Sequence, residues 1–314
     1  KVQRKGAFCQ GRSSCSKGTN VATPLPGFGY HAAPAGPRSG EQMKVMRLVA
    51  ALVVAVILGF GRESVHLQTG TGLPWTSDFE INSFGEWNGG VRSTNNLVVT
   101  GTGCYSGRCA QTDIVSGTVG DNYADKWFGD WFTLRGPKVE EVWLRFYSKF
   151  SAGYVWPNRS HKMAIINLTN GLDNLRHYQV YVYVNPNGRY AVDHSDIDNW
   201  RFYGLQQNVG TAVSPRPDQW DKIKLYVRLN TPGASDGVVR LWVNDELKLA
   251  RTDVPIRANT AFGMNKLILS ASATQAAVSN GYQWWDSWTL SATDPDGGAS
   301  VPAAPTNLRI LPSE

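Results

Sequence analysis

The stretch DGVVRLWVNDELKLAR, residues 236–251, indicates the fold class. In its first half two kinds of side chain alternate, with Val239, Leu241 and Val243 on one face and Arg240 and Trp242 on the other. A period of two predicts a β-strand with one buried face, and Asn244-Asp245 is suitable for a tight hairpin turn. The stretch therefore predicts two antiparallel strands.

Short alternating runs of this kind recur along the chain, whereas no segment has a sustained helical stripe. They occupy residues 96–101, 108–114, 142–150, 162–168, 177–184, 188–193, 222–229, 238–243, 246–251, 265–270 and 282–292. Many short strands separated by turns favour a sandwich over alternating strands and helices. We predict an all-β fold, a jelly-roll β-sandwich of two antiparallel sheets.

The positive charge of the chain is confined to its N-terminal part. Residues 1–61 hold eight Lys or Arg and one Asp or Glu, whereas residues 62–314 hold 23 and 24. The near-neutral remainder argues against nucleic acid as a partner. Within the basic part, Met43, Lys44 and Arg47 precede the apolar run 48–60, a pattern typical of a signal peptide. We therefore expect a secreted protein, extracellular or periplasmic, with no membrane contact beyond that signal.

These observations predict five segments. Residues 1–42 form an upstream extension, 43–61 the signal peptide, 62–75 a linker, 76–293 a jelly-roll domain and 294–314 a Pro/Gly-rich C-terminal tail. Cys104 and Cys109 enclose a short polar loop in GCYSGRCA, and in an oxidising compartment we expect a disulfide between them.

Two of the predicted strands carry aromatic and polar side chains opposite their apolar faces. In HYQVYVYV, residues 177–184, these are His177, Gln179, Tyr181 and Tyr183; in WLRFYSKF, residues 143–150, they are Trp143, Arg145, Tyr147 and Lys149. Aromatic rings stack on sugar rings, and cations pair with carboxylates. The structural alternative is an outer sheet face that is simply solvated.

The distribution of charge favours an anionic ligand. Residues 143–228 contain 11 Lys or Arg and six Asp or Glu, and no acid lies between Glu141 and Asp173. A glycoside hydrolase needs two carboxylates that flank the scissile bond. The nearest acidic cluster, DHSDID at residues 193–198, is predicted to be a loop.

The order of FEINSFGEWNG, GRCAQT, WLRFYSKF, SHKMAIINL, DGVVRLWVND and YQWWDSWTL resembles the concanavalin A-like lectin/glucanase superfamily, and within it the polysaccharide lyase jelly rolls. Lyases of family 14 carry a catalytic Lys, then a Ser-x-Arg strand and a Tyr-x-Tyr pair. Lys162 resembles that Lys in position, and Gln179 and Tyr181 fall where Ser and Arg are expected. Tyr190 matches the first Tyr, with Val192 in place of the second.

This resemblance implies a metal-independent lyase that cleaves a uronate-containing polysaccharide by β-elimination. The expected catalytic residues are Lys162, His177, Tyr181 and Tyr183, with His161 and His194 as further candidates for the base. The expected substrate-binding residues are Trp143, Arg145, Tyr147, Lys149, Gln179 and Tyr190. We expect the two sets to line one groove in a monomer.

Other functions fit the same sequence. A lectin-like carbohydrate-binding module would use the same aromatic face without chemistry, and a glycoside hydrolase of the same superfamily or a sandwich that packs its aromatics against a partner is also compatible. The expected reaction needs no cofactor and no metal at the catalytic site. Asp286, in YQWWDSWTL, is either a ligand of a structural calcium or a hydrogen-bonded core aspartate.

Overall fold

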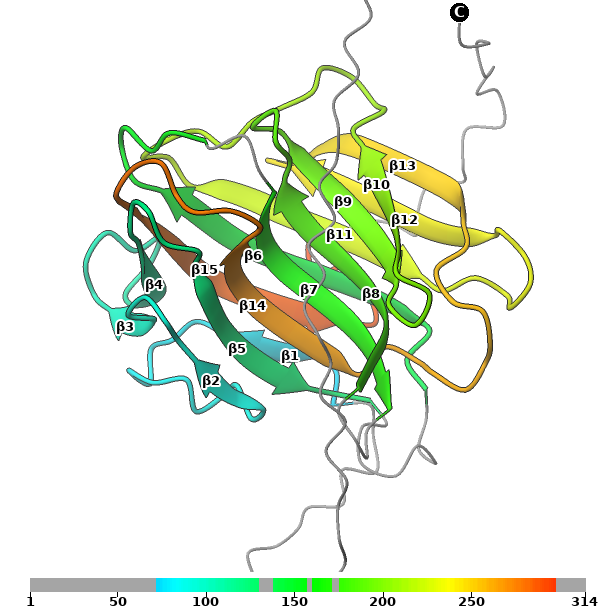
Figure 1. Ribbon diagram of the computed structural model, residues 1–314. Coiled ribbons are helices and arrows are strands. Elements are labelled where there is room, and N and C mark those ends of the chain that lie inside the picture. The colour runs from blue at the N-terminus through cyan, green and yellow to red at the C-terminus, as the bar shows by residue number, and fades with distance from the viewer. Residues whose placement is uncertain (1–71, 130–137, 157–159, 171–174, 298–314) are drawn as a thin grey trace, which may run out of the picture. The chain divides into compact units, whose positions relative to one another are not determined.

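The computed structural model describes residues 72–129, 138–156, 160–170 and 175–297. The predicted extension, the signal peptide, most of the linker and residues 298–314 lie outside the described residues. The described residues form strands and no helix, and hence no helix that could span a membrane. The strands make two antiparallel sheets that face each other (Figure 1), so the predicted jelly-roll sandwich is confirmed.

The first sheet has eight strands. Its order is β13 (Glu246–Val254), β12 (Gly237–Val243), β11 (Asp221–Arg228), β6 (Glu141–Phe150), β15 (Gly281–Ser291), β4 (Cys109–Ile114) and β3 (Val98–Thr100), with β1 (Trp75–Ser77) paired to β15. The second sheet has seven strands. Its order is β10 (Arg201–Gln206), β9 (Tyr190–Asp196), β8 (Leu175–Val184), β7 (His161–Asn170), β14 (Lys266–Ala273), β5 (Asp121–Trp127) and β2 (Gly90–Arg92).

The opening stretch forms the predicted hairpin of β12 and β13. Val239, Leu241 and Val243 lie in the core. Asn244 and Asp245 both have positive φ, 52° and 66°, as a two-residue turn that follows the twist of the strands requires.

The core lies between the sheets and is rich in aromatic side chains. Trp288 stacks on Phe146, with ring centroids 4.4 Å apart, and meets Trp87 edge to face at 5.2 Å. Large apolar rings that are buried in this way dominate the hydrophobic stabilisation of a sandwich. The core therefore holds the two sheets together and fixes which residues point outward.

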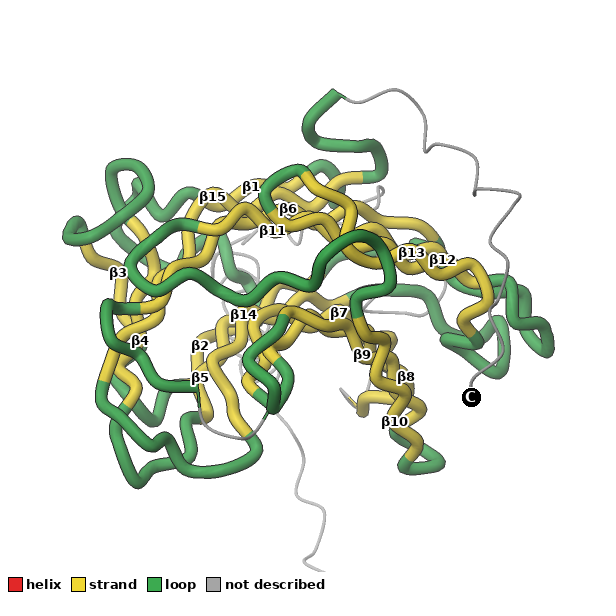
Figure 2. The backbone as a smooth tube through the Cα atoms, turned by 90° about the horizontal axis from the view of Figure 1, so that it is seen from above, coloured by secondary structure: helices red, strands yellow, loops and turns green. Residues whose placement is uncertain are grey.

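The seven-stranded sheet is arched. Seen from above (Figure 2), its centre at β7 and β14 lies close to the other sheet, while β5 and β2 on one side and β8 to β10 on the other bend away. The outer face of this sheet is therefore concave.

Candidate active site

Four ionisable side chains gather on the concave face, and we call them the Lys-Tyr-Tyr-Asp cluster. They are Lys162 on β7, Tyr181 and Tyr183 on β8 and Asp193 on β9. Lys162 is the cross-strand partner of Tyr183, and Tyr181 is that of Asp193. The Lys162 Nζ lies 4.7 Å from the centroid of the Tyr181 ring, and the two tyrosine rings are 5.5 Å apart. Their intervening neighbour Val182 is in the core, so strand alternation directs both phenols outward.

Tyr181 and Asp193 form a hydrogen-bonded pair of a phenol and a carboxylate. Desolvation by burial raises the pKa of Asp193 to about 6, although the hydrogen bonds from Tyr203 N and Tyr181 and the charge of Lys162 oppose this. Burial, together with the nearby Asp193 charge, also raises the pKa of Tyr181. Asp193 is therefore a stronger base than an exposed aspartate, and Tyr181 keeps its proton at neutral pH.

Tyr183 has different surroundings. Burial raises the pKa of its phenol, and a hydrogen bond with the Gln206 side chain lowers it in part. The Asn185 Nδ2 donates to the Gln206 Oε1 at 2.6 Å, which turns the Gln206 amide nitrogen toward the Tyr183 oxygen. Because that amide donates, the phenolic proton of Tyr183 can itself be donated to a bound molecule.

A row of buried polar groups continues the concave face beside the cluster. Asn167, Gln179 and Ser195 occupy consecutive positions across β7, β8 and β9 and are at most 1% exposed. Both side-chain polar atoms of Asn167, the Nε2 of Gln179 and the Oγ of Ser195 have no hydrogen-bond partner in the described structure. Unpaired buried polar atoms are costly, so this row is the least satisfied polar part of the seven-stranded sheet.

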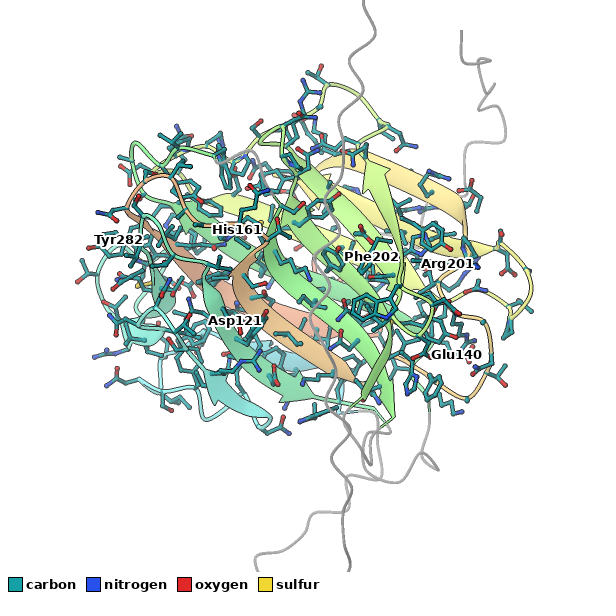
Figure 3. The ribbon with its side chains drawn as sticks, in the orientation of Figure 1. Asp121, Glu140, His161, Arg201, Phe202 and Tyr282 are labelled. Atoms are coloured by element: carbon teal, nitrogen blue, oxygen red, sulfur yellow. A yellow bond between two sulfur atoms is a disulfide. The ribbon has the colours of Figure 1, made fainter. Side chains whose placement is uncertain are left out.

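A hollow of about 580 Å³ extends the face toward β2. Ile165, which packs with Tyr181 in one apolar cluster, lines its near end. At the far end the Arg92 guanidinium lies 4.5 Å from the centre of the Tyr123 ring. In Figure 3, Asp121 on β5 and Phe202 on β10 mark the two sides of this concave face.

His177 lies on the concave face but apart from the cluster. Its Nδ1 is 2.8 Å from Asp198 Oδ2, and its ring stacks on Phe262 at 4.3 Å. Four residues of extended strand separate it from Tyr181, roughly 13 Å at about 3.3 Å per residue. This separation exceeds one sugar ring, so His177 and Lys162 do not act on the same bond as the sequence suggested.

Tyr190, His161 and His194 point into the protein. Tyr190 is 1% exposed and its hydroxyl donates to Asp221 Oδ2 at 2.8 Å, so the predicted substrate contact is wrong. His161 bonds to Gln283 of the opposite sheet at 2.7 Å. His194 stacks on Tyr203, and burial lowers its pKa to about 4. Neither of these histidines lies on the concave face.

The predicted single groove is also wrong, because β6 belongs to the other sheet. Its residues Trp143, Arg145, Tyr147 and Lys149 lie on the outer face of the eight-stranded sheet, across the core from the cluster. A period of two predicts which side chains of β6 share a face, but it does not predict the sheet to which the strand belongs.

Carboxylates of the predicted tail neutralise three cations of that outer face. Asp296 lies 3.0 Å from Arg145, from Lys222 and from Lys224, and Asp294 lies 3.1 Å from Lys224. The cations of residues 143–228 therefore lie on two different faces of the sandwich. Lys162 faces the concave site, whereas Arg145, Lys222 and Lys224 pair with carboxylates of the chain.

Asp286 is fully buried and accepts hydrogen bonds from the backbone nitrogens of Ser106 and Ser287, at 3.0 and 2.6 Å. Of the two alternatives for Asp286, a calcium ligand or a hydrogen-bonded core aspartate, these contacts correspond to the second. The described residues contain no group of three His, Cys, Asp or Glu arranged to hold a metal ion. The predicted disulfide between Cys104 and Cys109 is present, with the Cα atoms 5.3 Å apart.

Sequence reasoning missed Asp193, Gln206 and Asn185. The sequence predicts a loop at DHSDID, residues 193–198, yet β9 continues to Asp196 and so includes Asp193. The alternation in this segment is the signal for Asp193, because Tyr190 and Val192 face the core and Asp193 therefore faces outward. Gln206 lies on β10, an edge strand without an apolar alternation, and no sequence pattern pointed to it.

Residues 177–272 match the model of the family Polysaccharide lyase 14. A marine PL-14 alginate lyase from Aplysia kurodai has a similar structure, with 11% identity, coverage of 69% of this chain and 97% of that chain, and a TM-score of 0.52. An endo-β-1,4-glucuronan lyase from the fungus Trichoderma reesei is 13% identical, with coverage of 70% of this chain and 95% of that chain and a TM-score of 0.51. The alginate lyase vAL-1 from Chlorella virus is 12% identical, with coverage of 68% of this chain and 98% of that chain and a TM-score of 0.50.

At these identities the structural likeness concerns the fold. No curated protein gives a significant match to the sequence. The segment that matches the family model carries Tyr181, Tyr183 and Asp193, and Lys162 precedes it on the adjacent strand. The resemblance to polysaccharide lyase family 14 that the sequence predicts is thereby confirmed.

Proposed function

We propose that the protein is a polysaccharide lyase that cleaves an acidic, uronate-containing chain by β-elimination on the concave face. The observation that carries this proposal is the Lys-Tyr-Tyr-Asp cluster, in which a cation, a hydrogen-bonded acceptor pair and a second phenol lie on adjacent strands. The family match over residues 177–272 supports the same reaction class.

The reaction requires a positive group to neutralise the uronate carboxylate, because this acidifies the neighbouring ring proton. Lys162 supplies that charge. It lies over the Tyr181 ring, next to the pair that accepts the proton. Since a side chain provides the cation, the proposed step needs no metal.

Tyr181 and Asp193 accept the ring proton together. The Tyr181 oxygen takes the proton from the sugar carbon while its own phenolic proton passes to the Asp193 carboxylate. This concerted transfer avoids a free phenolate, which the raised pKa of Tyr181 disfavours. The electrons of the broken C–H bond form the double bond and expel the glycosidic oxygen.

Tyr183 donates its proton to the departing oxygen. The amide of Gln206, oriented by Asn185, stabilises the phenolate that this transfer leaves.

The proposed setting is extracellular or periplasmic, with the protein acting as a monomer. The disulfide between Cys104 and Cys109 supports an oxidising compartment. The even balance of charge in residues 62–314 supports a role without nucleic acid.

The test is incubation of the protein with glucuronan and with alginate, while the ultraviolet absorbance of the unsaturated product is followed. A rise in absorbance with either polymer supports elimination. Binding to either polymer without such a rise would favour a lectin instead.

A further inference from the structure

A second group of aromatic side chains lies on the outer face of the eight-stranded sheet, around Lys149 and across the core from the cluster. Its members come from the disulfide loop, β6, the segment before β11 and β15, and they are Tyr105, Tyr147, Trp220, Tyr282 and Trp284. We call this group the aromatic platform. Tyr282 lies at the rim of the molecule near the start of β15 (Figure 3).

Two rings of the platform are largely exposed although they pack on neighbouring rings. Tyr105 is 51% exposed and Tyr282 is 44% exposed. Tyr105 nevertheless stacks on Tyr147 with ring centroids 4.1 Å apart and planes at 22°, and meets Trp220 edge to face at 5.9 Å. Tyr282 packs at 5.6 Å from Trp284.

Buried contacts hold Tyr105 in place. Its loop is closed by the disulfide between Cys104 and Cys109, and the Asp286 carboxylate accepts from the next backbone nitrogen, Ser106 N. Gly103 lies beside the Trp284 ring, where an added Cβ would be in ordinary van der Waals contact at 3.5 Å. An exposed ring that is fixed before binding loses little conformational entropy when a ligand stacks on it.

The polar groups of the platform suit an acidic sugar. The Lys149 Nζ lies 4.7 Å from the centre of the Trp284 ring and 5.4 Å from that of Trp220. Its nearest carboxylate, that of the exposed Asp218, is 3.9 Å away. The indole nitrogen of Trp284 donates to Gln111 at 2.8 Å, which fixes the ring plane. A cation framed by ring faces can pair with a uronate while the rings stack on the sugar.

We infer that the aromatic platform is a second binding site for an acidic polysaccharide strand, separate from the site of elimination. The two sites lie on outer faces of opposite sheets, so one sugar unit cannot occupy both. A strand held on the platform keeps the protein on its polymer while the concave face is free to bind another segment. The nature of the polymer rests on the proposed function, whereas the existence of the platform does not.

The experiment is affinity electrophoresis in gels that contain glucuronan or alginate, with neutral hydroxyethylcellulose for comparison. The parent protein carries Tyr183→Phe, so that it digests the gel about 100-fold more slowly. We expect retardation by an acidic polymer and none by the neutral one. Tyr105→Ala with Trp220→Ala should weaken that retardation at least tenfold, whereas Tyr105→Phe, which keeps the ring, should retain it. In the background without Tyr183→Phe, cleavage of short uronate oligosaccharides should not change.

Unchanged retardation of the double variant would overturn the inference, as would equal retardation by the neutral polymer or no retardation of the parent. Tyr105→Ala alone alters a surface ring and should fold as the parent does. A threefold or larger loss in that variant supports the platform, and no loss contradicts it. Failure of the proposed function would appear separately, as absent cleavage of the oligosaccharides by protein with Tyr183 intact.

Discussion

Tyr181 on β8 and Asp193 on β9 are directly opposed cross-strand partners, with the phenol hydrogen-bonded to the carboxylate. Asp193 is 7% exposed, and Lys162 approaches the same pair from β7. This relationship joins an acceptor, a phenol and a cation on three adjacent strands.

Asp193→Asn should remove the final proton acceptor and lower the turnover number by about 100-fold or more, the usual scale for a lost acid–base group. Because the pKa of Asp193 is raised to about 6, wild-type turnover should increase as the pH rises through that value. Steady-state rates from pH 4.5 to 8 measure both effects. A profile that is flat across pH 6 would remove Asp193 from the mechanism.

The same carboxylate should also affect stability. Its folded pKa, about 6, lies above the ordinary value of 3.8, so the folded state binds more protons than the unfolded state between these values. Stability should therefore fall as the pH rises from about 4 to 6, by up to about 3 kcal/mol. Asp193→Asn should stabilise the protein at pH 8 and flatten this dependence. Urea unfolding at pH 4 and at pH 8 tests it, and a less stable variant at pH 8 would contradict it.

Tyr183→Phe should preserve packing and remove the proton that the leaving oxygen receives. We expect a turnover number about 100-fold lower with little change in KM. Gln206→Met should have a smaller effect in the same direction, because it removes only the amide that supports the phenolate. Tyr203→Phe is a matched control, since Tyr203 stacks on His194 outside the cluster. Equal losses in Tyr183→Phe and the control would indicate a general defect.

Asp296 should contribute to stability through the three cations that surround it. Although burial opposes the shift, Lys222, Lys224 and Arg145 lower the pKa of Asp296 to about 2. Its stabilisation is therefore present above about pH 4 and lost as the pH falls toward 2. Asp296→Asn should cost about 1–2 kcal/mol at neutral pH. Asp253→Asn, at an exposed pair with Arg251, should cost less than about 0.5 kcal/mol. Equal costs in chemical denaturation would contradict this account.

Strand alternation was sufficient to predict much of the fold and half of the cluster. In residues 177–184 the period of two is unbroken, so Val180 and Val182 identified the core side and Tyr181 and Tyr183 the concave side. In β5, by contrast, the inward positions are Asn122 and Ala124, and a strand with so little apolar character was not predicted.

The remaining errors have two physical causes. The period of two assigns side chains to faces but does not assign strands to sheets, so β6 and β8 were joined in one groove although they lie in different layers. The face of a strand after a turn depends on the geometry of that turn. Asn185 N bonds to Arg189 O across the NPNG turn, and this register directs Tyr190 inward and Asp193 outward.

The most direct measurement compares wild type with Tyr181→Phe on glucuronan and alginate, with the absorbance of the unsaturated product recorded and binding determined independently. The account predicts a rise in absorbance with wild type on at least one polymer. Tyr181→Phe should reduce its rate about 100-fold or more and change the affinity by only about 1 kcal/mol. Polymer binding by wild type without any unsaturated product, or full activity of Tyr181→Phe, would contradict it.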